Sequence, residues 1–316
     1  QFDWSHPGLR NVMHLMGPAI LGNAAVQINV TVNNNFASRL DDPNGPISWL
    51  GYAFRFMQLP IGIFGVAIGS ATLPAISRSA AAQNFEEFRQ TLSRSLGLVF
   101  LLTIPSAVGL AVLGETIVGA IYQLGRFTAA DTTQTARALS CYAIGLVGYA
   151  AAKILNPAFY ALQDSRTPML ISFGSIVINL VTVITMIRVF GFGHEGLALS
   201  TSAVAIFSSV GLFTVMRQRI GGIYGRNLWS SFWRVTLASA LMGAAIWGTS
   251  HEIVTNFGTS KMMRFLDLAI SIPVGMIVLY YICRILRVSE LDLAVRSLAG
   301  PLQRKLPFLR ARIANQ

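Results

Sequence analysis

The sequence predicts an all-α integral membrane protein, a bundle of about eight transmembrane helices. The first observation is composition: 53% of the residues are hydrophobic and 12% are charged, whereas soluble domains carry about 25% charged residues. The second is distribution, because four charge-free runs each reach the ~20 apolar residues that cross a bilayer core as a helix. A chain with so little polar surface is solvated by lipid rather than by water. The four runs are 56–77, 95–114, 167–187 and 196–216.

Eight spans can be drawn along the chain, and no stretch between them is long enough for a soluble domain. The connections carry turn residues, such as DDPNGP at 41–46 and FGFGHEG at 190–196. The longest connections are 78–91 and 115–131. The second of these is too short to cross the membrane, so we expect a small interfacial helix there. The predicted spans are 11–38, 48–77, 92–114, 132–161, 167–187, 196–216, 231–250 and 263–286.

The basic residues predict how the bundle is oriented. Eight spans place both ends of the chain on one side, and that side carries sixteen basic residues against six on the other. By the positive-inside rule both ends are cytoplasmic, so the net charge of +11 is mostly a topology signal. Nucleic-acid binding is disfavoured, because it needs positive charge gathered on one soluble face. The sixteen are Arg10, Arg78, Arg89, Arg94, Arg166, Arg217, Arg219, Arg226, Arg234, Arg284, Arg287, Arg296, Arg304, Lys305, Arg310 and Arg312; the six are Arg39, Arg126, Arg137, Arg188, Lys261 and Arg264.

The C-terminal tail, SELDLAVRSLAGPLQRKLPFLRARIANQ, mixes apolar and basic residues. A segment of this kind lies on the anionic surface of the inner leaflet, so anionic membrane lipids are expected partners. For the last ten residues a frayed terminus is an equally good interpretation.

Arg55 breaks the membrane rule, because a charge in mid-span costs about 2.5–3.5 kcal/mol. It shares a polar and small-residue stripe with Gly51, Gln58, Gly62 and Gly69. Helix packing explains the glycines but not the arginine, which would then have to snorkel to the headgroups. A guanidinium facing a cavity is suited to bind phosphate, because its donors match two phosphate oxygens at once.

A second basic residue, Lys153, lies within the fourth span. It shares one helical face with Asn156 and with three tyrosines. Snorkelling explains the lysine alone, whereas the aligned tyrosines and Asn156 favour the lining of a wet cavity. The three tyrosines are Tyr142, Tyr149 and Tyr160.

The first span carries a polar stripe of its own. Asn23, Gln27 and Asn34 lie in one sector together with Thr31 and Ser38. So many polar groups cannot face hydrocarbon unpaired. Interhelical hydrogen bonds could satisfy a few, but a complete stripe favours a water-filled central space. Asn29 and Asn33 lie on another sector of the same span.

Catalytic motifs are absent from the sequence. It has no phosphate-binding glycine loop, no pair of carboxylates within a span and no cluster of metal ligands, so we expect neither a cofactor nor an enzyme. Cys141 and Cys283 lie in apolar runs and are interpreted as small core residues. Asp267 is the only acid near a span interior, close to the outer end.

Three stretches resemble the C-terminal half of the MviN/MurJ family of lipid II flippases, in the multidrug/oligosaccharidyl-lipid/polysaccharide exporter superfamily. The second-span motif and the QDSRTP loop are fairly specific together, and the resemblance covers residues 7 to 286. The stretches are WLGYAFRFMQLPIGIFGVAIGSATLP (49–74), LGRFTAADTTQTARAL (124–139) and KILNPAFYALQDSRTPM (153–169).

The resemblance implies a fold of two six-helix lobes around a cationic cavity, followed by two further helices that form a lipid-tail groove. Residues 1–225 would be the second lobe, 226–287 the additional pair and 288–316 a basic amphipathic cytoplasmic tail. The missing first lobe would belong to the same polypeptide, and half a cavity cannot alternate. The absence of an initial Met also suggests a piece of a longer protein.

The family moves lipid II, an undecaprenyl-diphosphate-linked muropeptide, from the inner to the outer leaflet of the bacterial cytoplasmic membrane by alternating access. Arg55 matches the cavity arginine of this lobe, whereas Gln58 stands where some relatives carry an acid. Some relatives are thought to bind sodium through acids in this lobe; the fifth span here offers Asn179 and no carboxylate, so we expect no metal site. The expected substrate-binding residues are Arg55, Gln58, Gln27, Asn34, Asn23, Lys153 and Asn156.

Other functions remain open from the sequence. An exporter of drugs or O-antigen lipids belongs to the same superfamily, although a cationic drug would favour acids in the cavity. A membrane scaffold without cargo would have a dry interior, which the polar stripes disfavour. A membrane-embedded enzyme lacks a catalytic constellation here.

Overall fold

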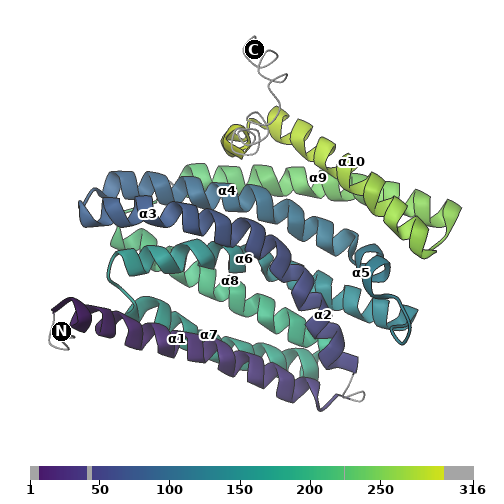
Figure 1. The fold of residues 1–316 in the computed structure, drawn as a ribbon, viewed down its shortest axis with the longest axis horizontal. Coiled ribbons are helices and arrows are strands. Elements are labelled where there is room, and N and C mark those ends of the chain that lie inside the picture. Colours follow the sequence, from purple (N-terminus) through teal and green to yellow (C-terminus); the bar gives the residue numbers. More distant parts are fainter. Residues whose placement is uncertain (1–6, 41–44, 224, 295–316) are drawn as a thin grey trace, which may run out of the picture.

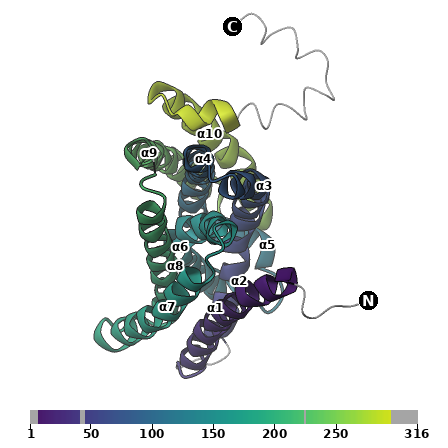
Figure 2. The same ribbon diagram turned by 90° about the vertical axis from the view of Figure 1, so that its left-hand side faces the viewer.

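The computed structural model describes residues 7–40, 45–223 and 225–294, and these are helical almost throughout. Eight long helical rods lie side by side within these residues (Figures 1 and 2). A short helix, α5, lies at the end of the bundle. The elements are α1 (Pro7–Ala37), α2 (Gly45–Pro60), η1 (Ile61–Val66), α3 (Ala67–Ala81), α4 (Phe85–Val112), α5 (Gly114–Tyr122), α6 (Ala129–Ala161), α7 (Arg166–Ile184), η2 (Thr185–Val189), α8 (His194–Arg219), α9 (Gly225–Phe257) and α10 (Lys261–Ile285).

The predicted spans match these rods, with longer helices than expected. Among the described residues, six rods are long and apolar enough to cross a membrane, including the continuous rod Gly45–Ala81. The remaining two, α1 and α9, run alongside them and have 31 and 33 residues. The short helix expected in the connection 115–131 is present as α5 (Gly114–Tyr122), which has nine residues. The prediction of a long connection at 78–91 was wrong, because α3 and α4 extend into it.

The turn between α3 and α4 shows why that connection is helical. Asn84 caps α4 by accepting a hydrogen bond from the backbone N–H of Glu87 at 3.2 Å, and two glutamates lie in the first turn. Both features stabilise the positive end of the helix dipole. The charged residues therefore start a helix rather than form a loop.

Helix α6 lies at the centre of the bundle, in contact with α2, α3, α4, α5 and α8 (Figure 2). Two glycines allow the close approach to α8. A Cβ on Gly145 would lie 2.6 Å from the Cα of Ser202, and one on Gly148 would lie 2.7 Å from the carbonyl oxygen of Ala205. Small residues bring helix backbones together in this way in membrane bundles.

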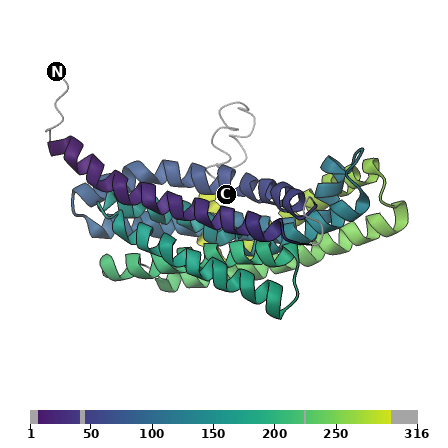
Figure 3. The ribbon, with the colours of Figure 1, turned by 90° about the horizontal axis from the view of Figure 1, so that it is seen from below.

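The connections divide between the two ends of the long axis. The links α3–α4, α6–α7 and α8–α9 lie at the left of Figure 1, with the start of α1. The links α1–α2, α7–α8 and α9–α10 lie at the right, and Figure 3 shows the same arrangement from below. This alternation is the up-and-down topology on which the basic-residue count rests.

The pair α9–α10 packs on α4 and α5 at one side of the bundle. Asp267 of α10 is fully buried there and accepts hydrogen bonds from three hydroxyls, those of Thr116, Ser250 and Ser271, at 2.6–3.0 Å. A buried carboxylate is tolerated only when it is paired in this manner. The cluster fastens the pair to α5.

The predicted tail begins against the bundle. Val288 and Ala294 are buried, residues 289–294 are helical, and Glu290 accepts a hydrogen bond from the hydroxyl of Ser231 at 2.6 Å. The rest of the tail, 295–316, lies outside the described residues. Cys283 is buried and Cys141 half-buried, and both are free thiols.

Candidate functional site

The outward face of α1 carries amide side chains. Asn23, Gln27 and Asn34, three of the predicted binding residues, are exposed along it. They alternate with apolar residues that are also exposed, such as Ile28 and Val30. None of the three amide groups forms a hydrogen bond with another side chain in the described part of the chain. Their polar groups are therefore available to water or to a ligand.

The opposite sector of α1 holds the helix to its neighbours. The Asn29 amide donates to the Ser175 hydroxyl at 3.0 Å, and the Asn33 amide donates to the Thr201 hydroxyl at 2.9 Å. Asn179 donates to the backbone carbonyl of Asn29 at 3.3 Å. Two asparagine sectors thus have different tasks: one attaches α1 to α7 and α8, and the other stays open.

Arg55 is exposed on α2, in the middle of an aromatic neighbourhood. Its guanidinium carbon lies 5.6 Å from the centre of the Tyr52 ring, a cation–π distance. It makes no ion pair or hydrogen bond with another described residue. Gln58, one turn on, is also exposed. The Arg55 guanidinium therefore has unused hydrogen-bond donors on an apolar helix.

The glycines of the predicted Arg55 stripe separate in the structure. Nothing lies within 4 Å of a Cβ built on Gly51 or Gly62, whereas one on Gly69 would lie 2.8 Å from the backbone oxygen of Lys153. The intervening segment Ile61–Val66 is a π-helix, whose wider turns rotate the residues that follow. Gly69 thus belongs to the α3–α6 contact and not to the exposed stripe, which corrects the prediction of one continuous face.

The predicted face of α6 is only partly open. Lys153 is exposed and Asn156 half-buried, so both remain accessible. Tyr142, by contrast, is buried with its ring 5.6 Å from that of Phe54. The prediction of a tyrosine-lined wet wall was wrong for Tyr142, because α2 and α8 cover that end of α6.

The seven predicted residues thus lie on three neighbouring helices, since α2 contacts both α1 and α6. Six of the seven are exposed and Asn156 is half-buried. The structure does not join them to one another by hydrogen bonds within the described residues. Among those residues there is also no group of three or more His, Cys, Asp or Glu side chains that could hold a metal ion.

Sequence reasoning missed two polar clusters that position the helices. One is the asparagine junction of α1 with α7 and α8, whose signal was the second amide sector. The other is the hydroxyl cage around Asp267. Ser271 lies one turn from Asp267 on α10, but the hydroxyls of Ser250 and Thr116 come from α9 and α5, which helical periodicity within α10 could not indicate.

Comparison with known proteins gives a consistent result. The family model described as lipid II flippase MurJ matches residues 1–267. The lipid II flippase MurJ of Burkholderia cenocepacia is 35% identical over 258 residues, covering 81% of this chain and 48% of that protein. A probable lipid II flippase MurJ of Vibrio cholerae is 32% identical over 249 residues, covering 78% and 46%. The chain spans about half the length of the curated relatives it matches.

Solved structures agree. A lipid II flippase MurJ in an inward closed conformation superposes with a TM-score of 0.68 at 27% identity, covering 89% of this chain and 57% of that one. An outward-facing multidrug resistance MATE family transporter of the MOP superfamily superposes with a TM-score of 0.59 at 17% identity, covering 90% and 67%. The second likeness concerns the fold alone. With the family match over most of its length, the chain belongs to the lipid II flippase MurJ family.

Proposed function

We propose that this chain is the second half of a transporter that moves lipid II from the inner to the outer leaflet of the bacterial cytoplasmic membrane by alternating access. Residues 1–225 supply the second lobe and 226–287 the two additional helices. The relatives, lipid II flippases by name, support lipid II as the substrate. One observation carries the proposal: uncommitted polar side chains, Arg55 among them, are exposed on otherwise apolar helices.

The energetics of Arg55 favour a phosphate ligand. A charge in an apolar span costs about 2.5–3.5 kcal/mol when unpaired. The rod Gly45–Ala81 contains no acid to offset it. A diphosphate accepts two guanidinium hydrogen bonds at once, each contributing about 1.5–3 kcal/mol. Substrate binding thus compensates the cost of placing Arg55 there.

The remaining predicted residues suit the rest of the headgroup. Asn23, Gln27 and Asn34 offer amide donors and acceptors, which sugar hydroxyls and peptide groups require. Gln58 stands one turn from Arg55, while Lys153 and Asn156 lie farther along the bundle on α6, where the backbone of Lys153 meets Gly69 of α3. A cationic drug would need carboxylates instead, so the superfamily's drug exporters are a poorer model for this face.

The exposed polar face needs a facing wall. The curated relatives are about twice as long as the matched part, and the partner we propose is a first lobe of the same polypeptide. Two lobes enclosing a midplane site and rocking around it is the general mode of such transporters. The chemistry is binding and movement, with no covalent step, so the protein is a transporter and not an enzyme.

We also propose that both ends of the chain are cytoplasmic. The sixteen-to-six distribution of basic residues supports this orientation. The basic tail from residue 288 would then face the anionic inner leaflet and contact its lipids.

The test uses cells whose own lipid II flippase is depleted. The full-length protein that contains this chain is expected to restore growth and the appearance of lipid II on the outer leaflet, measured with an external lipid II-cleaving probe. Expression without any outer-leaflet lipid II would contradict the proposal. Restoration by an unrelated membrane transporter, run in parallel, would show that the assay lacks specificity.

A further inference from the structure

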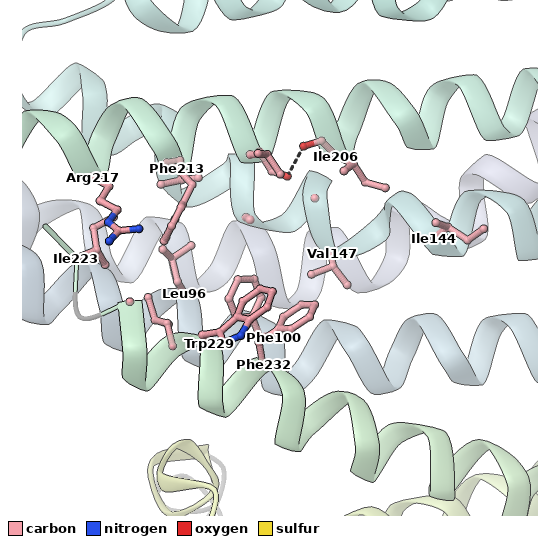
Figure 4. Close-up of a pocket in the computed structure, with 17 residues that line it drawn as sticks. Leu96, Phe100, Ile144, Val147, Ile206, Phe213, Arg217, Ile223, Trp229 and Phe232 are labelled. Carbon is pink, nitrogen blue, oxygen red and sulfur yellow. Dashed lines mark hydrogen bonds between the residues drawn. The ribbon is translucent and has the colours of Figure 1, made fainter. Parts of the chain in front are cut away.

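A second cavity, of about 1080 Å³, lies away from the polar face. It is bounded by α4, α6, α8 and α9, and Figure 4 shows its lining side chains. None of the seven proposed headgroup-binding residues lines it. Its volume is at the upper end of the ~300–1,000 Å³ of ligand sites. The cavity is therefore large enough for a substantial apolar ligand.

The walls of this cavity are almost wholly apolar. Phe100 and Phe232 meet edge to face with ring centres 5.4 Å apart, and Trp229 stacks on Phe232 at 5.9 Å. Gly148 of α6 belongs to the floor, where its lack of a side chain lets α8 approach. Ser209 and Arg217 are the polar side chains in the lining, apart from the Trp229 ring N–H.

Arg217 stands at one end of the cavity, near Phe213 and Ile223 (Figure 4). Its side chain is exposed and makes no ion pair or hydrogen bond with another described residue. Its neighbour on α8, Arg219, pairs with Asp164. The two arginines therefore differ: one closes a contact within the protein, and the other leaves a full positive charge at the mouth of an apolar groove.

The depth of the groove corresponds to one leaflet. Along α8 the lining runs from Arg217 to Ile206, eleven residues or about 16 Å of helix axis. The hydrocarbon core of a bilayer is about 30 Å thick, so the groove reaches roughly its middle. Ile206 and Val210 are exposed on the lining, with relative accessibilities of 43% and 58%, so the groove opens sideways to lipid.

We propose that this groove binds one anionic phospholipid, with an acyl chain along α6 and α8 and the phosphate at Arg217. A single lipid presents a negative group at the leaflet surface and an apolar chain one leaflet deep, which matches both ends of the groove. Among the described residues, no acidic side chain lines the cavity to repel the headgroup. Trp229, which lines the groove beside Phe232, is of the residue type enriched at membrane interfaces. The lipid fills the space between α8 and α9 and braces the additional helices against the lobe.

The site differs from the proposed headgroup site in ligand and position. The lipid is a resident of the inner leaflet, not cargo, and its binding does not require the protein to transport anything. If the protein did not transport lipid II, the groove could still bind a phospholipid. If the groove did not bind a phospholipid, the proposed transport would be unaffected.

Trp229 provides a native reporter. The full-length protein is reconstituted in phosphatidylcholine vesicles that contain a small fraction of phosphatidylglycerol or phosphatidylcholine with brominated acyl chains, because bromine quenches tryptophan on contact. Subtracting the signal of Trp229→Phe isolates Trp229 from the other tryptophans. The anionic lipid is expected to quench about fivefold more effectively than the zwitterionic one, the effect of one basic residue at an anionic site.

Three variants decide the source of that preference. Arg217→Gln is expected to lower the ratio of quenching by the anionic lipid to quenching by the zwitterionic lipid to about one. Arg94→Gln removes another exposed arginine, one that does not line the cavity, and should leave the preference unchanged. Val147→Phe fills the groove without touching Arg217 and should also lower the preference.

Several results would overturn the inference. Equal quenching by the two lipids in the unaltered protein would show that the groove is not selective or is covered by another segment. A preference that survives Arg217→Gln or Val147→Phe would assign it to other basic residues or to the headgroup region alone. The last test is a competition against the brominated lipid. If a polyprenyl diphosphate relieves the quenching at a mole fraction at which phosphatidylglycerol gives no relief, the groove would be assigned to a polyprenyl chain instead.

Discussion

The guanidinium of Arg219, at the end of α8, forms an ion pair with the carboxylate of Asp164, between α6 and α7. The same carboxylate accepts hydrogen bonds from the backbone N–H groups of Arg166 and Thr167 at 3.1 and 3.0 Å, and from the Thr167 hydroxyl at 2.7 Å. Asp164 therefore starts α7 and ties three helices together. Burial raises the pKa of Asp164, but the Thr167 hydrogen bonds, the Arg219 charge and the Arg166 N–H outweigh it and lower the pKa overall.

Replacing this carboxylate is expected to destabilise the bundle. Asp164→Ala removes the acceptor for the start of α7 and the partner of Arg219, at a cost of about 1–3 kcal/mol. The apparent melting temperature in detergent should fall by several degrees. Asp292→Ala is the matched control, because Asp292 is exposed and has no partner among the described residues. Equal melting temperatures for the two variants would contradict the role of Asp164.

The contribution of the Asp164 charge should depend on pH. Because the pKa of Asp164 in the folded protein lies below its ordinary value of 3.8, the folded state favours the charged carboxylate. The stabilisation is fully present above the unfolded-state pKa and is lost as the pH falls through the folded-state pKa. The melting-temperature difference between the unaltered protein and Asp164→Asn should stay constant from about pH 8 to about pH 5 and shrink below pH 3.8. A difference that grows in acid would contradict this sign.

Much of the fold could be predicted from the sequence, because lipid imposes long apolar helices. Four of the eight rods follow from charge-free run length, and the others follow from apolar stretches bounded by turn residues. The charged pair Glu86 and Glu87 suggested a connection, but acidic side chains favour a helix start, and α4 begins there. The π-helix Ile61–Val66 leaves no signal in residue periodicity, and it displaced Gly69 from the predicted stripe.

The candidate site was less predictable, because periodicity shows which residues share a helical face but not whether another helix covers that face. Periodicity placed Asn23, Gln27 and Arg55 on polar faces, and these faces are open. The same reasoning put Tyr142 on a wet face, where packing of α2 and α8 buries it. Which neighbour covers which face depends on contacts between distant segments, and helical period carries no information about those.

Membrane orientation gives a direct test of the basic-residue argument. In a variant without Cys141 and Cys283, a single cysteine is placed at Phe190, exposed between η2 and α8, or at Gln83, between α3 and α4. Cysteine at Phe190 should react with an impermeant maleimide in intact cells, and cysteine at Gln83 only after lysis. The reverse pattern would invert the proposed topology.

The account also predicts what the isolated chain does. Residues 1–316 alone should insert into liposomes but not move lipid II, because one lobe provides one wall of the proposed cavity. The full-length protein in parallel liposomes is the positive control, with lipid II exposure measured by an external probe. Transport by 1–316 at a rate like that of the full-length protein would show that a second lobe is dispensable.

Arg55 is the centre of the proposed function, and its variants test it most directly. Arg55→Lys keeps the charge but loses the planar pair of donors, so outer-leaflet lipid II should fall partially. Arg55→Ala should abolish complementation at normal expression. Arg126→Ala is the control, because Arg126 is exposed in the connection before α6 and is not a proposed site residue.

The decisive measurement is outer-leaflet lipid II in flippase-depleted cells that carry the full-length protein with Arg55→Ala. The account predicts no outer-leaflet lipid II, with the protein present in the membrane at the level of the Arg126→Ala control. Normal lipid II exposure and normal growth of the Arg55→Ala strain would remove Arg55 from the site and contradict the proposal.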